Sequence, residues 1–524
     1  MTMTSLKPLI AVCGTTGVGK SKLGVELALK LGQEIYQDCS GGHRWRGARI
    51  INSDSMQVYT GMDVITNKIP QAERMGVEHL LMDFKQPGEQ YVVGQWVHDA
   101  IQVIEETHKM NQIPVVVGGT SYWIQHLLFP NRLASKDLNS TPIEATTSGH
   151  PMSALRDSIS QLTPNLLNLW TALPESPPNA VTHPEDALSL HELLQALDPP
   201  VASRWHWRDT RKVLRSLRIM KETSRTPSEI ISEQSESPLI PRYRTLCFWV
   251  YAEPSALNSR LDERVDDMIK QGLLDEARSL RKIASLSQAA ISCSSVDVKD
   301  EPDSPASDPD YTVGIYQCIG FKEFHEFLSL SNGPGSQEAF KKSVENMKQS
   351  TRKYAKRQIT WLRNKLLPAI HSANLHSGNE IPMASMYILD ATVLGDQWTS
   401  NVLSPAESIT KSFLREEELP PPASLSSVAS AMFANQNKSV HPSDVLRARK
   451  KIVCQVCTTD PRRPVMIDEQ YWDAHGGNRL HRRLIAKSKK GFKGLPPGPR
   501  GSVAPKRSSA DESLYPDESL HTPS

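Results

Sequence analysis

The chain has 524 residues, a length that corresponds to two to four domains of ordinary size. It is 38% hydrophobic and 23% charged, which excludes a wholly disordered chain, and its net charge of +2 gives no general attraction to nucleic acid. It contains no apolar run long enough to span a membrane. Seven cysteines are too few for a disulfide scaffold, and the first predicted strand begins near Leu9, which leaves no room for a signal peptide. We therefore expect a cytoplasmic protein, with nuclear and mitochondrial pools left open.

Residues 9–130 are predicted to be α/β. A short apolar run, Leu9–Cys13, enters a glycine-rich turn and then a helix over Lys22–Leu31. A second run, Ile113–Val117, has the length and the Val/Ile content of a buried parallel strand, and a third enters the polar residues after Ile51. Ligands bind at the carboxyl ends of such strands, so we expect the site there.

The rest of the chain is predicted to divide by composition and periodicity. The stretch 283–310 is rich in Ser, Asp and Pro, as disordered segments are. The expected order is a helical region (131–225), irregular in its first part, the second part of the core (226–366) with the disordered insert 283–310, a linker (367–444), a small basic module (445–493) and a disordered tail (494–524).

The turn after the first strand matches the phosphate-loop pattern G-x-x-x-x-G-K-[ST]. Its residues are Gly14, Thr15, Thr16, Gly17, Val18, Gly19, Lys20 and Ser21. Backbone N–H groups of such a loop surround an anion, the lysine adds a positive charge, and the serine hydroxyl can hold Mg²⁺. The alternative is a glycine-rich turn that arose by chance. The pattern predicts a diphosphate or polyphosphate ligand and does not by itself predict a nucleotide.

A phosphate-loop ATPase also needs a strand that ends in an acid to hold Mg²⁺. The strand Ile113–Val117 ends instead in Gly118, Gly119 and Thr120. The one well-placed acid is Asp54, at the end of the strand that follows the phosphate-loop helix. Asp54 could hold Mg²⁺ indirectly, through a ligand of the ion, or it could be the general base that takes a proton from an acceptor. The simpler interpretation is that it caps the turn that follows it.

Two basic segments indicate a nucleic-acid surface. Arg208, Arg211, Arg215 and Arg218 are spaced three, four and three residues apart, so they form one stripe on a helix, opposite Leu214 and Leu217. The segment 351–365 carries six Lys and Arg and no acid, together with Tyr354 and Trp361. The alternatives are a solvated helix face for the stripe and an exposed helix with core aromatics for 351–365.

The C-terminal module has the residue types of a zinc finger. Cys454 and Cys457 are followed, after 17 residues, by His475, and then by His481. Seven Lys and Arg without an acid lie between Arg479 and Lys493, which is typical of a helix that contacts nucleic acid. A nuclear-localisation signal without bound metal is the alternative.

Taken in order, these motifs resemble the tRNA dimethylallyltransferase (isopentenyltransferase) family. The motifs are GTTGVGKS, NSDSMQVY with Thr66-Asn67-Lys68, VVVGGTSYW, the helix around Arg211–Leu217, Arg260–Met268, Gly314–Phe324 and Tyr354–Trp361. They cover about 9–130, 186–282, 312–366 and 445–490. The C-terminal finger is similar to that of the eukaryotic branch.

Four stretches depart from the family pattern. Residues 37–49 lie where the family runs straight through, as a surface loop or an unspliced stretch, and they could disturb the strand that presents Asp54. Residues 131–185 diverge where the family has a tRNA-gripping helical insertion, and 283–310 is additional. Trp207-Arg208 replaces the usual Pro-Asn.

The resemblance implies a P-loop parallel-sheet core, a helical tRNA-binding region and a C2H2 zinc finger. It implies transfer of a dimethylallyl group from its diphosphate to N6 of adenosine 37 of tRNA, with tRNA and dimethylallyl diphosphate as partners, Mg²⁺ and structural Zn²⁺ as cofactors, and a monomer. Asp54 would be the base, while Thr16, Lys20 and Arg264 would bind the diphosphate beside the rest of the phosphate loop, with Ser21 on Mg²⁺. The implied tRNA contacts are Asp54, Ser55, Met56, Gln57, Thr120, Arg211, Lys212, Val213, Leu214 and Arg215, and the implied zinc ligands are Cys454, Cys457, His475 and His481.

Two other functions remain open at this point. A small-molecule or nucleotide kinase would share the phosphate loop, but it would need the missing strand-end acid and would have no use for basic arms. A non-catalytic RNA-binding protein could result if the insert 37–49 had disabled the core. Against that interpretation, Lys20, Ser21, Asp54 and Arg264 are all present.

Overall fold

The computed structural model describes residues 6–37, 44–130, 152–236, 238–292, 311, 313–330, 335–375, 382–434 and 450–491. The chain divides into two compact units, Met1–Lys450 and Lys451–Ser524. None of the described helices is long and apolar enough to cross a membrane.

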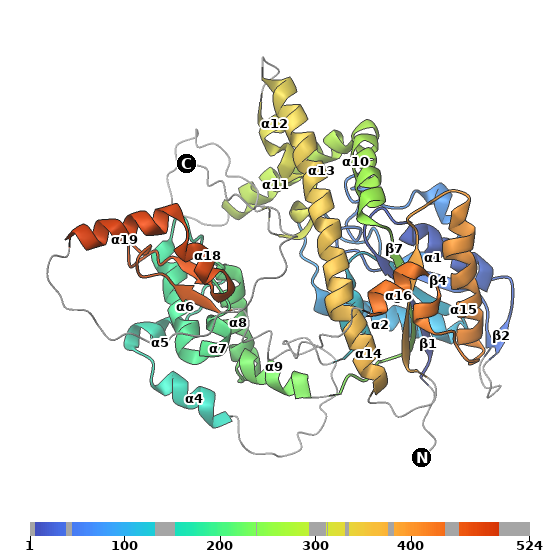
Figure 1. Ribbon diagram of the computed structural model, residues 1–524, viewed down its shortest axis with the longest axis horizontal. Helices are drawn as coiled ribbons and strands as arrows, with labels where there is room; N and C mark the ends of the chain where they lie inside the picture. Colours follow the sequence, from blue (N-terminus) through green and yellow to red (C-terminus); the bar gives the residue numbers. More distant parts are fainter. Residues whose placement is uncertain are drawn as a thin grey trace, which may run out of the picture. The chain divides into compact units, whose positions relative to one another are not determined.

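The first unit is built on a parallel sheet, as the sequence predicts (Figure 1), and this sheet has six strands. The strand order is β5-β4-β6-β1-β7-β8. The central strand β1 pairs with β6 on one side and β7 on the other, so that Ile10 lies opposite both Val115 and Leu246. The bounds are β1 (Pro8–Gly14), β4 (Ala48–Asn52), β5 (His79–Leu80), β6 (Ile113–Gly118), β7 (Arg244–Tyr251) and β8 (Ala384–Asp390).

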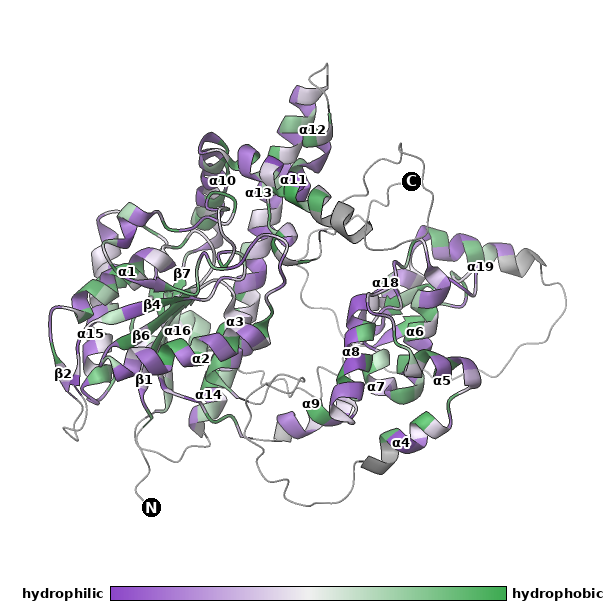
Figure 2. Ribbon diagram, turned by 180° about the vertical axis from the view of Figure 1, so that it is seen from behind, coloured by the Kyte–Doolittle hydropathy of each residue, from purple (hydrophilic) through white to green (hydrophobic). Residues whose placement is uncertain are grey.

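Both faces of this sheet are buried, because alternate residues of each strand point to opposite sides. Leu9, Ala11 and Cys13 enter one core, covered by α2, α3, α11 and α14, while Ile10 and Val12 enter the other, covered by α1 and α15. Figure 2 shows the strands in the green of hydrophobic residues. The helices around the sheet are α1 (Lys20–Leu31), α2 (Val93–Lys109), α3 (Ser121–Leu128), α10 (Pro254–Lys270), α11 (Leu273–Ser292), α13 (Ser336–Trp361), α14 (Leu367–Leu375) and α15 (Ser404–Leu414).

The prediction that residues 367–444 form a linker is wrong over most of their length. It contributes α14, β8, α15 and α16 (Ser427–Ala434) to the core. β8 pairs with β7 over seven residues, from Thr245↔Ala384 to Tyr251↔Asp390. The apolar runs here are short and are separated by Pro- and Ser-rich pieces, so their periodicity is too weak to reveal a sixth strand.

Two of the departures from the family pattern are resolved by the structure. The ends of the insert 37–49 form a short antiparallel hairpin of β2 (Tyr36–Gln37) and β3 (Arg44–Trp45), with buried Tyr36 opposite buried Trp45. The strand β4 that leads to Asp54 keeps its full pairing with β6. The sequence predicts disorder over 283–310, but the first part of this segment is helical, because α11 continues to Ser292. The rest, 293–310, lies outside the described residues.

Residues 152–236 form a helical region with a core of its own, as predicted for 131–225, and α9 packs on α7 and α8, so the region extends past the predicted boundary at residue 225. Leu190, Leu194, Val213 and Leu217 are buried at its centre. The described part begins at Met152, so most of the segment expected to be irregular, from 131 to 151, lies outside it. The helices are α4 (Met152–Ser160), α5 (Pro164–Thr171), α6 (Pro184–Leu197), α7 (Pro199–Ala202), α8 (Thr210–Thr223) and α9 (Pro227–Glu236).

Shorter elements complete the two units. In the first unit, α12 (His325–Ser329) packs on α13, which continues through a π-helical turn, Leu362–Leu366, into α14. The second unit is a ββα arrangement made of β9 (Lys451–Val453), β10 (Met466–Asp468), α18 (Trp472–Gly476) and α19 (Arg479–Gly491). The predicted tail 494–524 lies outside the described residues.

Candidate active site and zinc finger

The phosphate loop connects β1 to α1, as predicted. Gly17 and Gly19 have φ angles of 83° and 92°, which glycine adopts without steric cost. Lys20 is partly buried, and its Nζ donates to the carbonyl oxygen of Thr15 at 2.6 Å. Thr15 and Val18 are buried, whereas Thr16 and Ser21 are partly exposed at the loop tip and at the start of α1. The loop therefore has the shape that binds a diphosphate at a helix N-terminus.

Trp398, which precedes α15, packs on the outer side of this loop. A Cβ at Gly19 would lie 2.7 Å from the indole, so the ring touches the glycine backbone directly. The indole N–H donates to Glu26 Oε2 at 2.7 Å, and the Lys22 ammonium lies 4.7 Å from the ring centroid. Trp398 is missing from the sequence prediction because it lies in the stretch expected to be a linker.

Asp54 lies at the carboxyl end of β4 and faces the phosphate loop. Its Oδ1 accepts the Met56 N–H at 3.0 Å, so the capping role and a catalytic role are compatible in one carboxylate. The other oxygen, Oδ2, is the one nearest Gly119, where an added Cβ would lie 3.5 Å from it. Burial raises the pKa of Asp54, and the Met56 N–H, Lys20 and Arg264 oppose that rise.

The residues after Asp54 hold the adjoining loops. Ser55 donates its N–H to Thr120 Oγ1 at 3.1 Å, which joins the ends of β4 and β6. Gln57 Nε2 donates to the carbonyl oxygens of Thr66 and Asn67, at 3.2 and 3.0 Å. Met56 is partly buried. Thr120 and Gln57 thus have structural partners in addition to the tRNA contacts that the resemblance implies.

Arg264 reaches the site from α10, as predicted, and Asn67 orients it. Arg264 Nε donates to Asn67 Oδ1 at 2.7 Å, and Nη1 lies 3.4 Å from Thr16 Oγ1. Asn67 has a φ of 52°, a conformation that asparagine tolerates better than most residues. Its loop is held in turn by Glu276, whose carboxylate accepts the N–H groups of Val64 and Ile65 at 3.0 and 2.7 Å. The sequence motif includes Asn67, but the spacing gives it no role.

Three charges share this site, and each changes the protonation of the others. Burial lowers the pKa of Lys20 to about 8, with Asp54 raising it and Arg264 lowering it. Burial likewise lowers the pKa of Arg264 to about 10, again opposed by Asp54. At neutral pH Lys20 and Arg264 are therefore both charged, and two cations in one site suit the stabilisation of a departing anion.

The helix α13 closes the site from a third direction. Gln358 is 5% exposed and contacts both the phosphate loop and the residue after β6. Tyr354 lies one turn earlier, and burial, followed by Asp54, raises the pKa of its phenol. Trp361 packs edge-to-face on Tyr122 of α3. Tyr354 and Trp361 are thus partly buried against neighbouring groups, while Lys353, Lys356 and Arg357 are exposed.

The basic stripe on α8 is only partly as predicted. Arg208 is exposed but lies before α8 begins, so it is not part of a helical stripe as predicted. Arg211, Lys212 and Arg215 are exposed on α8, although Lys212 pairs with Asp209 and Arg215 with Glu222, at 3.5 and 3.3 Å. Arg218 instead donates to the Pro174 carbonyl oxygen at 2.9 Å. The resemblance also places Val213 and Leu214 among the tRNA contacts. Both are buried in the helical core, so this prediction is wrong for their side chains.

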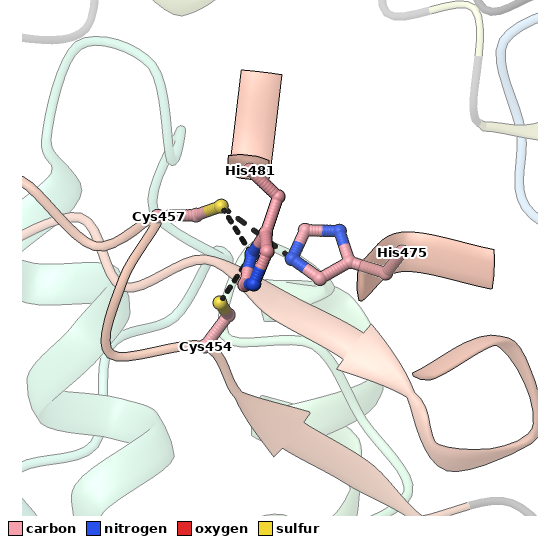
Figure 3. A group of neighbouring side chains, drawn as sticks. All are labelled: Cys454, Cys457, His475 and His481. Atoms are coloured by element: carbon pink, nitrogen blue, oxygen red, sulfur yellow. Dashed lines mark hydrogen bonds between the residues drawn. The ribbon is translucent and has the colours of Figure 1, made fainter. Parts of the chain in front are cut away.

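The second unit brings together the four predicted zinc ligands (Figure 3). Their ligand atoms all lie within 4.8 Å of one another. Cys457 Sγ is 3.4 Å from His475 Nε2 and 3.3 Å from His481 Nδ1, and Cys454 Sγ is 3.4 Å from His481 Nδ1. Two sulfurs and two nitrogens around a tetrahedral Zn²⁺ would be about 3.5 Å apart. The donor set therefore fits a structural zinc ion.

The fold and the site together define a P-loop α/β protein in which Lys20, Arg264 and the partly buried Asp54 face one another and Gly119 and Thr120, not an acid, follow the strand β6. Its sequence relatives are consistent with that class. The chain belongs to the IPP transferase family, whose match covers residues 57–365 and so includes Asn67, Thr120, Arg264 and Gln358.

Named relatives extend the match over nearly the whole chain. The chain is 33% identical to the tRNA dimethylallyltransferase of Schizosaccharomyces pombe over 498 residues, which is 92% of this chain and 96% of the relative. It is 30% identical to the tRNA dimethylallyltransferase of Homo sapiens, covering 92% of this chain and 87% of the relative. A crystal structure of a eukaryotic dimethylallyltransferase acting on tRNA superposes with a TM-score of 0.64 at 29% identity, covering 93% of this chain and 98% of that one.

Proposed function

We propose that this chain transfers a dimethylallyl group from dimethylallyl diphosphate to N6 of the adenosine at position 37 of tRNA. The observation that carries the proposal is the meeting of Lys20, Arg264 and Asp54 in one site. The two cations suit a diphosphate leaving group. A nucleotide kinase would need an acid at the end of the strand to hold Mg²⁺, and that acid is missing, so Asp54 is better explained as a base for an acceptor amine.

The reaction assigns one task to each group. The N6 lone pair attacks C1 of the dimethylallyl group, the C1–O bond breaks, and its electron pair leaves with the diphosphate. Asp54 accepts the N6 proton, a role in which a general base typically contributes ~10²–10⁴-fold. Lys20, Arg264 and the N–H groups of the phosphate loop stabilise the charge that develops on the diphosphate. Thr16, whose Oγ1 lies 3.4 Å from Arg264 Nη1, would contact the leaving oxygens.

Mg²⁺ fits the same site. The Ser21 hydroxyl, at the start of α1, together with diphosphate oxygens and water would form the oxygen shell that Mg²⁺ prefers. When bound there, the ion would neutralise further negative charge on the diphosphate.

The acceptor base has to leave its stack to reach this site, as it does in other enzymes that act on bases. We assign the exposed cations of α8 and α13 to the tRNA backbone, because Lys and Arg position nucleic acid through phosphate contacts. The α8 residues are Arg211, Lys212 and Arg215, and Arg208 lies just before the helix. The zinc finger, with its basic helix α19, would add affinity and no chemistry.

Nucleoside analysis tests this proposal. The protein is incubated with unmodified tRNA, Mg²⁺ and dimethylallyl diphosphate, and the digested tRNA is examined by mass spectrometry. We expect N6-isopentenyladenosine without any requirement for ATP, and none from a tRNA that carries guanosine at position 37. Product that depends on ATP, or phosphorylation in place of prenylation, would favour the kinase instead.

A further inference from the structure

The side chain of Gln358 connects the two halves of the site. Its Oε1 accepts the Thr16 N–H of the phosphate loop at 3.0 Å, and its Nε2 donates to the Gly119 carbonyl oxygen at 3.0 Å. Thr16 follows β1 and Gly119 follows β6, and these two strands are neighbours in the sheet. One buried amide therefore joins the donor loop to the loop that adjoins the acceptor base.

An amide suits this position for a chemical reason. The Thr16 N–H needs an acceptor and the Gly119 carbonyl needs a donor, and a primary amide offers both on separate atoms at the end of one side chain. The hydrogen bond to Gly119 is buried and the one to Thr16 is partly buried, so losing the first leaves a buried carbonyl oxygen without its donor. The bridge therefore holds the spacing of the two loops more firmly than apolar packing would.

Gly119 lies between this amide and the catalytic carboxylate. A Cβ at Gly119 would come within 2.5 Å of Gln358 Nε2 and 3.5 Å of Asp54 Oδ2. Gln358, the Gly119 backbone and Asp54 are thus packed together without room for one further carbon atom. A displacement of Gln358 would be transmitted directly to the surroundings of Asp54 Oδ2.

We propose that Gln358 is a positioning residue, which fixes the distance between the diphosphate held by the phosphate loop and the base Asp54. The proposal rests on the assignment of Asp54 as base and of the phosphate loop as diphosphate site. The reacting carbon and the acceptor nitrogen have to approach in line, and a misplacement of about 1 Å can cost about 10²-fold in rate. Gln358 acts on that approach from α13 and need not touch either substrate.

Two variants separate positioning from packing. Gln358→Met keeps the length and volume but removes both hydrogen bonds. We expect kcat to fall by about 10–100-fold, with KM for dimethylallyl diphosphate and Kd for tRNA within about threefold of the wild type. Gln358→Glu keeps an acceptor for the Thr16 N–H but places a second carboxylate beside Asp54. We expect the acidic limb of its kcat–pH profile to move upward by about one pH unit.

The matched control is Gln349→Ala, on an exposed position of the same helix, which should leave both kinetics and pH profile unchanged. Thermal unfolding of each variant is measured alongside. A kcat loss that merely follows the loss of folded protein, with an unmoved acidic limb in Gln358→Glu, would reduce Gln358 to a packing residue and overturn the proposal. Tighter diphosphate binding by Gln358→Met would also overturn it, because the amide would then be a competitor for the Thr16 N–H. If the wild type made no prenylated tRNA, the proposed function would fail first, and the two failures are therefore distinguishable.

Discussion

We expect the charge of Lys20 to set an alkaline limit on diphosphate binding. Burial lowers the pKa of this lysine to about 8, and Asp54 keeps it from falling further. With that pKa, about nine-tenths of Lys20 is charged at pH 7 and about one-tenth at pH 9. If the charged form binds the diphosphate, as proposed, kcat/KM for dimethylallyl diphosphate falls about tenfold between these two pH values.

The turnover number should respond differently. A bound diphosphate stabilises the charged lysine and raises its pKa in the complex. We therefore expect kcat, measured at saturating dimethylallyl diphosphate and tRNA, to stay nearly constant over the range in which kcat/KM falls. The assay is initial-rate transfer at saturating tRNA and Mg²⁺ from pH 6.5 to 9.5.

The variant Lys20→Arg is the control for this assignment. Arginine stays charged throughout the range, so its profile should lose the alkaline limb even if its absolute rate is lower. In Asp54→Asn, where the carboxylate no longer supports the lysine charge, binding of dimethylallyl diphosphate measured by calorimetry should weaken at a lower pH. A flat wild-type profile to pH 9.5, or the same limb in Lys20→Arg, would refute the reasoning.

Three further predictions address the neighbours of the site. Trp398→Ala should raise KM for dimethylallyl diphosphate about tenfold, equivalent to about 1.4 kcal/mol of lost support at Gly19, with tRNA affinity unchanged in filter binding; an unchanged KM would exclude the support. Asn67→Ala should lower kcat about 10–100-fold, because Arg264 loses the acceptor that orients it. Asn67→Asp keeps an acceptor oxygen and should retain more activity. Equal steady-state rates in the two variants would contradict this role of Asn67. Cys454→Ser should weaken tRNA binding and lose zinc by elemental analysis with kcat within about threefold at saturating tRNA, and retention of both would exclude the finger from tRNA binding.

The parts of the site that local sequence encodes were predictable. The phosphate loop carries its glycines, lysine and serine within eight consecutive residues, and Asp54 follows an apolar strand directly. Such short patterns fix both the backbone shape and the chemistry. The same holds for Cys454, Cys457 and the two histidines, whose spacing alone suggests a metal site and whose ligand atoms converge in the structure.

The parts of the site that depend on tertiary packing could not be predicted from the sequence. Gln358 lies in a basic helix where nothing in its neighbours marks it as the residue that turns inward, and only the fold places Thr16 and Gly119 on either side of it. Trp398 belongs to a segment whose strand, β8, becomes recognisable through its pairing with β7. On α8 the spacing predicts the basic stripe. The family motif, however, covers residues 211–215 as one block, so it does not distinguish the exposed basic residues from Val213 and Leu214, which are buried.

The most direct test of the proposed reaction is the transfer of label from dimethylallyl diphosphate to unmodified tRNA by the wild type and by Asp54→Asn, with tRNA binding measured on both. We expect incorporation by the wild type, a loss of at least about 10²-fold in the variant, and similar tRNA affinity in the two. Equal incorporation by the variant would contradict the role of Asp54 as base. A wild-type protein that binds tRNA but transfers no label would contradict the proposed reaction itself.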